Sequence, residues 1–256
     1  MADAFFDGHP QQDVAIRQYR GKVPMFFRRV RMMSAVFTAD LGALERALPP
    51  QLERKPIQVW PGQGLAAIGC FEYEDTDIGP YNEVALSIPF FNGKGIPSPR
   101  EVIASLRGKE VSAYIKELPV TTEAALFGGV DFFNYPKYLA DITFSETETT
   151  RTCALRESAG GALILELAGK KLATRAAESL DVAAANTYPI LQGRPVLARL
   201  LMNRQQSAST LDAAAAQVRL GPSARAEPFR ELGLGRLLQY VYAPRCQTIL
   251  LAPQAL

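Results

Sequence analysis

One lysine lies among aromatic side chains in a segment with few other charges. Residues 127–140 have the sequence FGGVDFFNYPKYLA, so Lys137 follows Tyr135-Pro136 and precedes Tyr138. An ammonium group in such surroundings loses hydration, which disfavours its charged form. A neutral amine is nucleophilic and condenses with a carbonyl compound to form a Schiff base. The same pattern is typical of a lysine that lies over tyrosine rings with its charged end in water, so the residues alone leave both interpretations open.

A second segment, residues 79–89 (GPYNEVALSIP), has the alternation of a β-strand. On a strand, Tyr81, Glu83 and Ser87 share one face, and the valine, leucine and isoleucine between them share the other. A carboxylate beside a phenol is suited to proton transfer. The alternation is equally typical of a strand whose polar face is solvated, with Glu83 pointing into water.

Histidine and cysteine chemistry is nearly excluded. His9 is the only histidine, and the three cysteines are far apart with no CxxC spacing. Zinc and non-haem iron sites need more histidine or paired cysteine than this, so we expect no metal. A Ser-His-Asp or Cys-His system would depend on His9 as its base. Any proton chemistry must therefore use Glu, Asp, Lys or Tyr, and no GxGxxG or Walker spacing indicates a nucleotide cofactor.

The composition is that of a globular protein. Hydrophobic residues make up 48% of the 256 residues and charged residues 21%, near the average for such proteins. The formal net charge is +2, with no block of like charge, so we expect no nucleic-acid partner. No apolar run approaches the length of a membrane helix, and the first residues lack the pattern of a signal peptide. Together with the unpaired cysteines, these features favour a cytoplasmic protein that does not bind membranes.

The 19 glycines and 18 prolines divide the chain into short segments, as in proteins with many strands. Extended segments are expected at 28–38, 65–74, 81–90, 121–127, 142–154, 162–168 and from 239 onward. Helices are expected at 40–48, with Asp40 as the N-cap, at 228–238 and in part of 102–115. We expect a single domain over residues 1–256, with 1–16 as a loose N-terminal tail. This mainly β (α+β) pattern predicts a barrel or double sheet flanked by helices.

Both chemical segments resemble the acetoacetate decarboxylase family. Gly129-Val130-Asp131 followed by Tyr135-Pro136-Lys137 is similar to the family's arrangement around its Schiff-base lysine. Residues 79–83 (GPYNE) are similar to the strand that supplies its active-site glutamate. The resemblance extends over nearly the whole chain. It implies an antiparallel cone-like β-barrel flanked by a few helices, a small keto acid as substrate, no cofactor, and a homo-oligomer.

The resemblance also implies roles for individual residues. Lys137 matches the lysine that forms an imine with the substrate ketone; acetoacetate decarboxylase is itself a standard example of an activated lysine. Glu83 matches a glutamate placed to transfer protons. An arginine before the first strand would bind the substrate carboxylate. The residues assigned to substrate binding are Arg29 (from the cluster Arg28, Arg29 and Arg31), Glu72 (with Glu74 as the alternative), Tyr81 and Tyr138.

One position departs from the family pattern. Acetone-forming members carry a second lysine directly after the Schiff-base lysine, where this chain has Tyr138. A neighbouring cation and burial are separate ways to favour a neutral amine, so burial can support imine chemistry by itself. The leading hypothesis is decarboxylation of a β-keto acid such as acetoacetate. The alternatives are aldol, dehydration or hydration chemistry on a 2-keto acid such as pyruvate, and a non-catalytic barrel that binds a small carboxylate.

Overall fold

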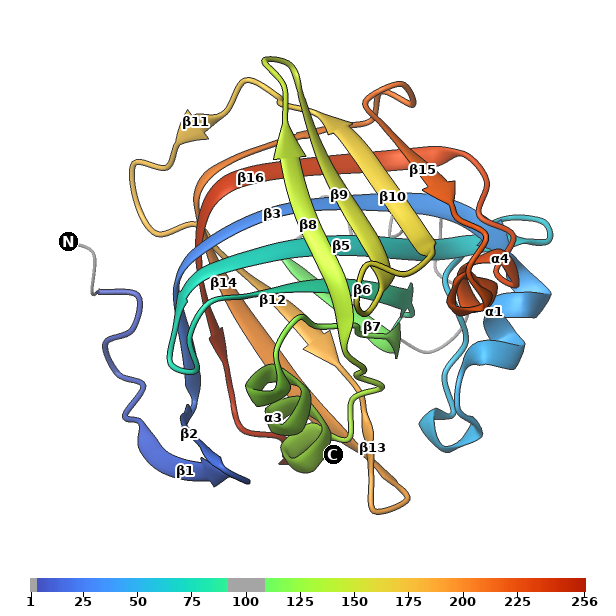
Figure 1. The fold of residues 1–256 in the computed structure, drawn as a ribbon. Helices are drawn as coiled ribbons and strands as arrows, with labels where there is room; N and C mark the ends of the chain where they lie inside the picture. Colours follow the sequence, from blue (N-terminus) through green and yellow to red (C-terminus); the bar gives the residue numbers. More distant parts are fainter. Residues whose placement is uncertain (1–3, 92–108) are drawn as a thin grey trace.

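The computed structural model describes residues 4–91 and 109–256, and its main feature is a closed β-barrel (Figure 1). The wall consists, in order, of β14 (Arg194–Thr210), β12 (Val182–Thr187), β7 (Glu110–Glu117), β6 (Tyr81–Pro89), β5 (Gln63–Thr76), β3 (Met25–Asp40) and β16 (Leu237–Leu250). β16 pairs with β14 and closes the ring. The predicted barrel is confirmed, but its wall is mixed, because β12 and β7 run parallel where an antiparallel wall was expected.

A second, antiparallel sheet covers one side of the barrel. It consists of β8 (Ala140–Glu146), β9 (Thr150–Glu157), β10 (Leu163–Lys170) and β15 (Ala216–Leu220), which cross over β3, β5 and β16 in Figure 1. The main hydrophobic core lies between the two layers, with Phe37 and Ile68 from the barrel and Leu155 and Leu167 from the second sheet. Outward-facing residues of β5 and β6 are therefore buried, and their alternate residues face the barrel interior.

Short helices and strands complete the fold. They are α1 (Leu41–Ala47), α3 (Glu123–Phe133), α4 (Glu227–Arg230), η1 (Pro50–Leu52), η2 (Ala224–Ala226), β1 (Gln12–Ile16), β2 (Tyr19–Val23), β4 (Gln58–Trp60), β11 (Arg175–Ala176), β13 (Ile190–Leu191) and β17 (Gln254–Ala255). As predicted, Asp40 caps α1, and its Oδ1 accepts a 2.7 Å hydrogen bond from the Ala43 amide. Within the described part of the chain, no helix has the length and apolar character needed to cross a membrane.

Two sequence-based assignments were wrong, and a third, the partial helix in 102–115, stays a prediction. Residues 121–127 were expected to be extended, but α3 begins at Glu123, because the Thr122 hydroxyl caps it and the following alanines favour helix. The helix expected at 228–238 ends at Arg230, since glycines at 233 and 235 interrupt the chain before β16. In the segment 102–115, residues 110–115 are strand rather than helix, and residues 102–108 lie outside the described residues.

The N-terminal residues also differ from the loose tail that was expected. β1 pairs with β2 along its whole length, and Ile16 at its end is almost fully buried. Further upstream, Phe5 packs in a small cluster with Phe26 and Ile249. Residues 4–16 are therefore held by buried apolar side chains at intervals along a mostly polar segment.

Candidate active site

The barrel encloses a cavity of about 330 Å³. On β6 it is lined by Tyr81, Glu83, Ala85 and Ser87, the face that period-two alternation predicted for this strand. The opposite face of β6 packs against the second sheet rather than water. Glu83 therefore points into an enclosed space and is not a solvated residue.

Glu83 and Lys137 form an ion pair at the wall of this cavity. Lys137 Nζ lies 2.7 Å from Glu83 Oε2, with only 7% and 10% of the two side chains exposed. The other carboxylate oxygen accepts a 3.2 Å hydrogen bond from the Tyr73 hydroxyl. The Tyr81 ring lies 5.8 Å from Nζ, within range of a cation–π contact. We call Lys137 and Glu83 the cavity pair.

The segment that carries Lys137 is held from both sides. On one side, the Pro136 and Tyr138 carbonyls accept hydrogen bonds of 3.2 and 2.9 Å from the amides of Leu118 and Val120. On the other side, helix α3 passes directly against the lysine stem. A Cβ atom at Gly129 would clash with Cδ and Cε of Lys137, so only glycine permits this approach.

Three tyrosines surround the cavity pair. Burial raises the pKa of Tyr73 and of Tyr81, and the negative charge of Glu83 raises both further. Burial also raises the pKa of Tyr135, whose hydroxyl lies 2.5 Å from Thr187 Oγ1. All three phenols therefore stay protonated at neutral pH. Sequence reasoning identified Tyr81 but missed Tyr73, although Tyr73 has the spacing of the inward face of β5 and pairs with Tyr81 across the sheet.

The structure does not bring Arg29 to the cavity. Its guanidinium binds Glu74 at 2.7 Å on the outer surface, with 62% of the side chain exposed. The reason is a pair of register shifts in β3 between Phe27 and Val30. They change which alternate residues face inward, so that Phe27 and Met32 line the cavity while Arg29 points into solvent.

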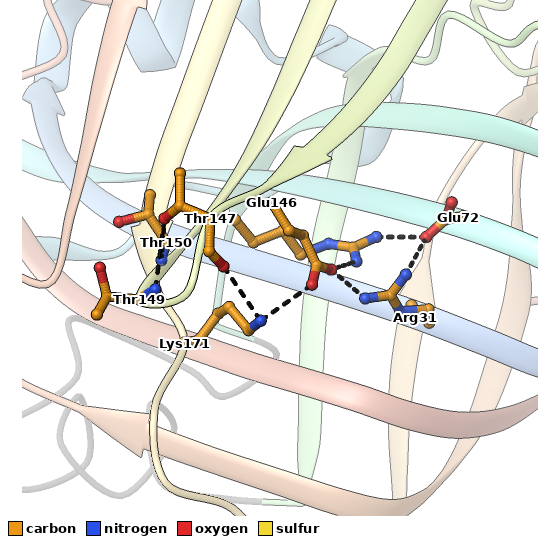
Figure 2. A network of polar contacts seen from close by, with 8 residues as sticks. Arg31, Glu72, Glu146, Thr147, Thr149, Thr150 and Lys171 are labelled. Carbon is orange, nitrogen blue, oxygen red and sulfur yellow. Dashed lines mark hydrogen bonds and ion pairs between the residues drawn. The ribbon is translucent and has the colours of Figure 1, made fainter.

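Glu72 belongs to a different site, between the barrel and the second sheet (Figure 2). Its Oε2 lies 2.5 Å from Arg151 and 3.2 Å from Arg31. Both arginines also bind Glu146, which in turn binds Lys171 at 3.2 Å. These five residues, Arg31, Glu72, Glu146, Arg151 and Lys171, are called the inter-sheet network below. Glu72 adjoins Phe71 on β5, and neighbouring strand residues point to opposite faces, so Glu72 does not line the cavity.

Tyr138 also points away from the cavity pair. Its ring packs against the main core, with the guanidinium of Arg225 4.5 Å above it. Burial raises the pKa of its hydroxyl, which has no hydrogen-bond partner among the described residues. The side chain at position 138 therefore points to the core between the barrel and the second sheet. A tyrosine in place of the lysine that the resemblance led us to expect does not alter the cavity lining.

The arrangement around Lys137 is that of a nucleophilic amine with an adjacent proton carrier. An amine beside a carboxylate in an enclosed apolar space can attack a ketone, and the carboxylate can move the protons that the addition requires. Across residues 4–91 and 109–256, no group of three or more His, Cys, Asp or Glu side chains is arranged to hold a metal ion.

Fold and cavity together define a β-barrel protein with a buried lysine–carboxylate pair. The family model of acetoacetate decarboxylase matches residues 13–252, and the chain belongs to this family. None of the curated proteins matches the sequence.

Solved structures agree with this assignment of the fold. Acetoacetate decarboxylase from Legionella pneumophila subsp. pneumophila str. Philadelphia 1 is similar with a TM-score of 0.63 at 16% identity, over 91% of this chain and 87% of that one. The enduracididine biosynthesis enzyme MppR complexed with pyruvate gives 0.58 at 12% identity, over 88% and 87%. An acetoacetate decarboxylase-like enzyme from Sphingomonas wittichii RW1 gives 0.51 at 17% identity, over 91% and 92%. At these identities the likeness shows the fold alone.

Proposed function

We propose that this protein is a carbon–carbon lyase that decarboxylates a β-keto acid through an imine on Lys137, with no cofactor taking part. The observation that carries the proposal is the 2.7 Å contact between Lys137 and Glu83 inside a mainly apolar cavity. Family membership supports the same reaction class.

The reaction conserves atoms and charge in four steps. Lys137 first passes one proton of its ammonium to Glu83, and the neutral amine adds to the ketone. Glu83 returns the proton to the carbinolamine hydroxyl, which leaves as water and gives a protonated imine. The bond between the carboxylate carbon and the α-carbon then breaks, CO₂ leaves, and its electron pair passes through the α-carbon to the imine nitrogen. The resulting enamine takes one proton on the α-carbon, supplied by solvent through Glu83, which is the proton that the overall reaction consumes. Water hydrolyses the new imine, which releases the ketone and restores the amine.

Glu83 is the proton carrier of this scheme. Its Oε2 lies against the amine and takes up or returns the protons that carbinolamine formation and dehydration move. Tyr73, which stays protonated, donates a hydrogen bond to Oε1 and holds the carboxylate in one orientation.

The cavity favours loss of the carboxylate over its retention. A carboxylate transferred from water into an apolar space loses hydration, whereas CO₂ is neutral and does not. Among the described cavity-lining residues the only arginine is Arg204, and it already binds Asp181 at 3.0 Å. A reaction that keeps the carboxylate through every step would need a cation dedicated to it.

A second candidate is aldol or dehydration chemistry on a 2-keto acid. It is favoured by the structures of MppR with pyruvate and with the condensation product of pyruvate and imidazole 4-carboxaldehyde. Both candidates use an imine on Lys137. They differ in the step that follows imine formation, which is loss of CO₂ in the first and an aldol or dehydration step in the second.

The test is borohydride reduction in the presence of acetoacetate or, separately, pyruvate, followed by intact-mass spectrometry. We expect a covalent adduct with acetoacetate whose mass shows that CO₂ has left, and no adduct in Lys137→Ala. An adduct with pyruvate alone would favour the second candidate. A Lys137→Ala protein that labels as well as wild type would overturn the assignment of the lysine. If that variant binds these acids with wild-type affinity and neither protein turns them over, the barrel is a binding protein.

We also propose that the protein is cytoplasmic and forms a homo-oligomer. The three cysteines are buried free thiols, which suits a reducing compartment such as the cytoplasm. We expect a homo-oligomer, and sedimentation equilibrium would measure its size.

A further inference from the structure

The cavity is much longer than acetoacetate requires. On β6 its lining runs from Tyr81 to Pro89, and on β5 from Leu65 to Tyr73. Each stretch spans eight residue steps, or about 26 Å at the usual rise of a strand. The cavity pair lies near one end, which leaves about 20 Å of strand between Glu83 and Pro89.

Small side chains keep this interior open. The inward residues of a small barrel usually fill its centre. Here the inward positions include Ala67, Ser87, Ala113, Ala183 and Ala185. Ala67 and Ser87 are neighbours across β5 and β6, one inward position before the end of the lining that is farther from the cavity pair, and both retain accessible surface inside the barrel. The cavity volume of about 330 Å³ lies within the range of pockets that bind drug-sized ligands.

The lining changes character along the cavity. At one end lie Lys137 and Glu83 with their tyrosines, and the described charged residues of the remaining lining are Lys109, Glu110 and Arg204. Glu110 pairs with Ala184 and Met202 pairs with Ala183, so this second group lies at the beginning of β12 or beyond it. Thr187, which contacts Tyr135, is at the opposite end of β12. The lining between the two charged groups is mostly aliphatic or small, with Val36, Val241, Leu200 and Met202 among its members.

From this length and polarity we infer that the substrate is a β-keto acid with an unbranched alkyl tail of medium length. The keto carbon lies at Lys137, and the tail extends along the barrel towards Ala67 and Ser87. The inference rests on the proposed function, because it takes the imine chemistry as given and names the substrate class. The bonds that break and form are those described above, and the product is a methyl ketone with the same tail.

Ligand binding tests the tail without any chemistry. Calorimetry would compare acetone with methyl ketones that carry pentyl and nonyl tails, which are the products expected from acetoacetate, β-oxooctanoate and β-oxododecanoate. Each buried methylene strengthens binding about threefold to fourfold, so the pentyl ketone should bind at least about tenfold more tightly than acetone. Equal affinities across the series would overturn the inference, whether or not Lys137 forms an imine.

Turnover by wild type and by two cavity variants tests where in the barrel the alkyl tail binds. We expect kcat/KM to rise from acetoacetate to β-oxooctanoate by at least about tenfold, after subtraction of spontaneous decarboxylation. In Ala67→Phe, and separately in Ser87→Leu, the corresponding advantage of β-oxododecanoate, whose longer nonyl tail extends to these positions, should disappear while turnover of acetoacetate remains, which also shows that each variant is folded. An advantage that survives both substitutions would place the tail elsewhere and contradict the inference. A Lys137 adduct with acetoacetate together with equal kcat/KM for all three acids would leave the proposed function standing and reject the tail.

Discussion

Charged side chains cluster in two places, the nearly buried cavity pair and the inter-sheet network, of which Arg151 alone is fully buried, and the two clusters differ in the number of partners that each charge has. In the cavity pair, one ammonium faces one carboxylate, and among the described residues the second carboxylate oxygen has the Tyr73 phenol as its single hydrogen-bond partner. In the inter-sheet network, three cations surround two carboxylates, and each carboxylate binds at least two of them. The network also joins the barrel wall to the second sheet (Figure 2).

The difference separates a site for chemistry from a site for stability. A buried ion that loses its partner is costly, so a network with several partners for each charge strongly resists rearrangement. The cavity pair has few partners and open space beside it, so its lysine can exchange the carboxylate for a substrate. Removal of charge from the cavity pair should therefore affect turnover most, and removal of charge from the network should affect stability most.

The largest expected effect is on turnover in Glu83→Gln. The amide keeps the shape of the side chain but cannot carry protons, so kcat should fall by about 10²–10⁴-fold. CO₂ release from acetoacetate measures the fall, and circular dichroism checks the fold. Glu74→Gln is the matched control, because that carboxylate pairs with Arg29 on the surface and should leave kcat unchanged. Wild-type turnover in Glu83→Gln would assign Glu83 a role in holding the lysine only.

Arg151→Met should have the largest effect on stability. Arg151 is 1% exposed and binds both carboxylates of the network, each of which keeps another cation when Arg151 is lost. The free energy of unfolding should fall by about 3 kcal/mol, measured in urea, with kcat per folded molecule unchanged. Arg219→Met, which breaks an exposed pair with Glu166, should change stability by less than about 1 kcal/mol. Equal losses of unfolding free energy in Arg151→Met and Arg219→Met would contradict the view that the inter-sheet network contributes more to stability than an exposed ion pair.

Sequence reasoning predicted the cavity pair better than the residues around it. The alternation of residues 81–87 placed Glu83 and Tyr81 on one face without deciding whether that face is solvated, and the aromatic surroundings of Lys137 left its burial open, so it was the family resemblance that assigned both residues to one site. That both faces of β6 are buried could not be predicted, because it depends on a second sheet formed some 60 to 140 residues later in the chain. Arg29 could not be placed either, since the register shifts in β3 depend on its pairing with β5 and β16.

Gly129→Ala tests how closely the helix positions the lysine. The added methyl group would overlap Cδ and Cε of Lys137, and a displacement of about 1 Å is enough to lower kcat by up to about 100-fold. Gly128→Ala is a matched control in the same helix, because its methyl group would meet Ile16 at an ordinary 3.4 Å. The control should keep kcat and gain up to about 1 kcal/mol of helix stability. Similar kcat values in the two variants would show that the lysine adapts freely.

The smallest effect is on acid stability in Glu146→Gln. Burial raises the pKa of Glu146, but hydrogen bonds from Lys171 and Arg151 and the charges of both arginines outweigh it, so the pKa is lowered. A carboxylate with a lowered folded-state pKa stabilises the fold above its unfolded value near about 4.3, and this stabilisation is lost as pH falls through the folded value. Wild type should therefore exceed Glu146→Gln in unfolding free energy by about 1 kcal/mol at neutral pH, with the gap narrowing progressively as pH falls below the unfolded value. Urea titrations across this range measure the gap, and Glu166→Gln, from an exposed pair, serves as the control. A gap that stays constant with pH would mean that the amide disturbs packing, and the charge of Glu146 would then contribute nothing to the network.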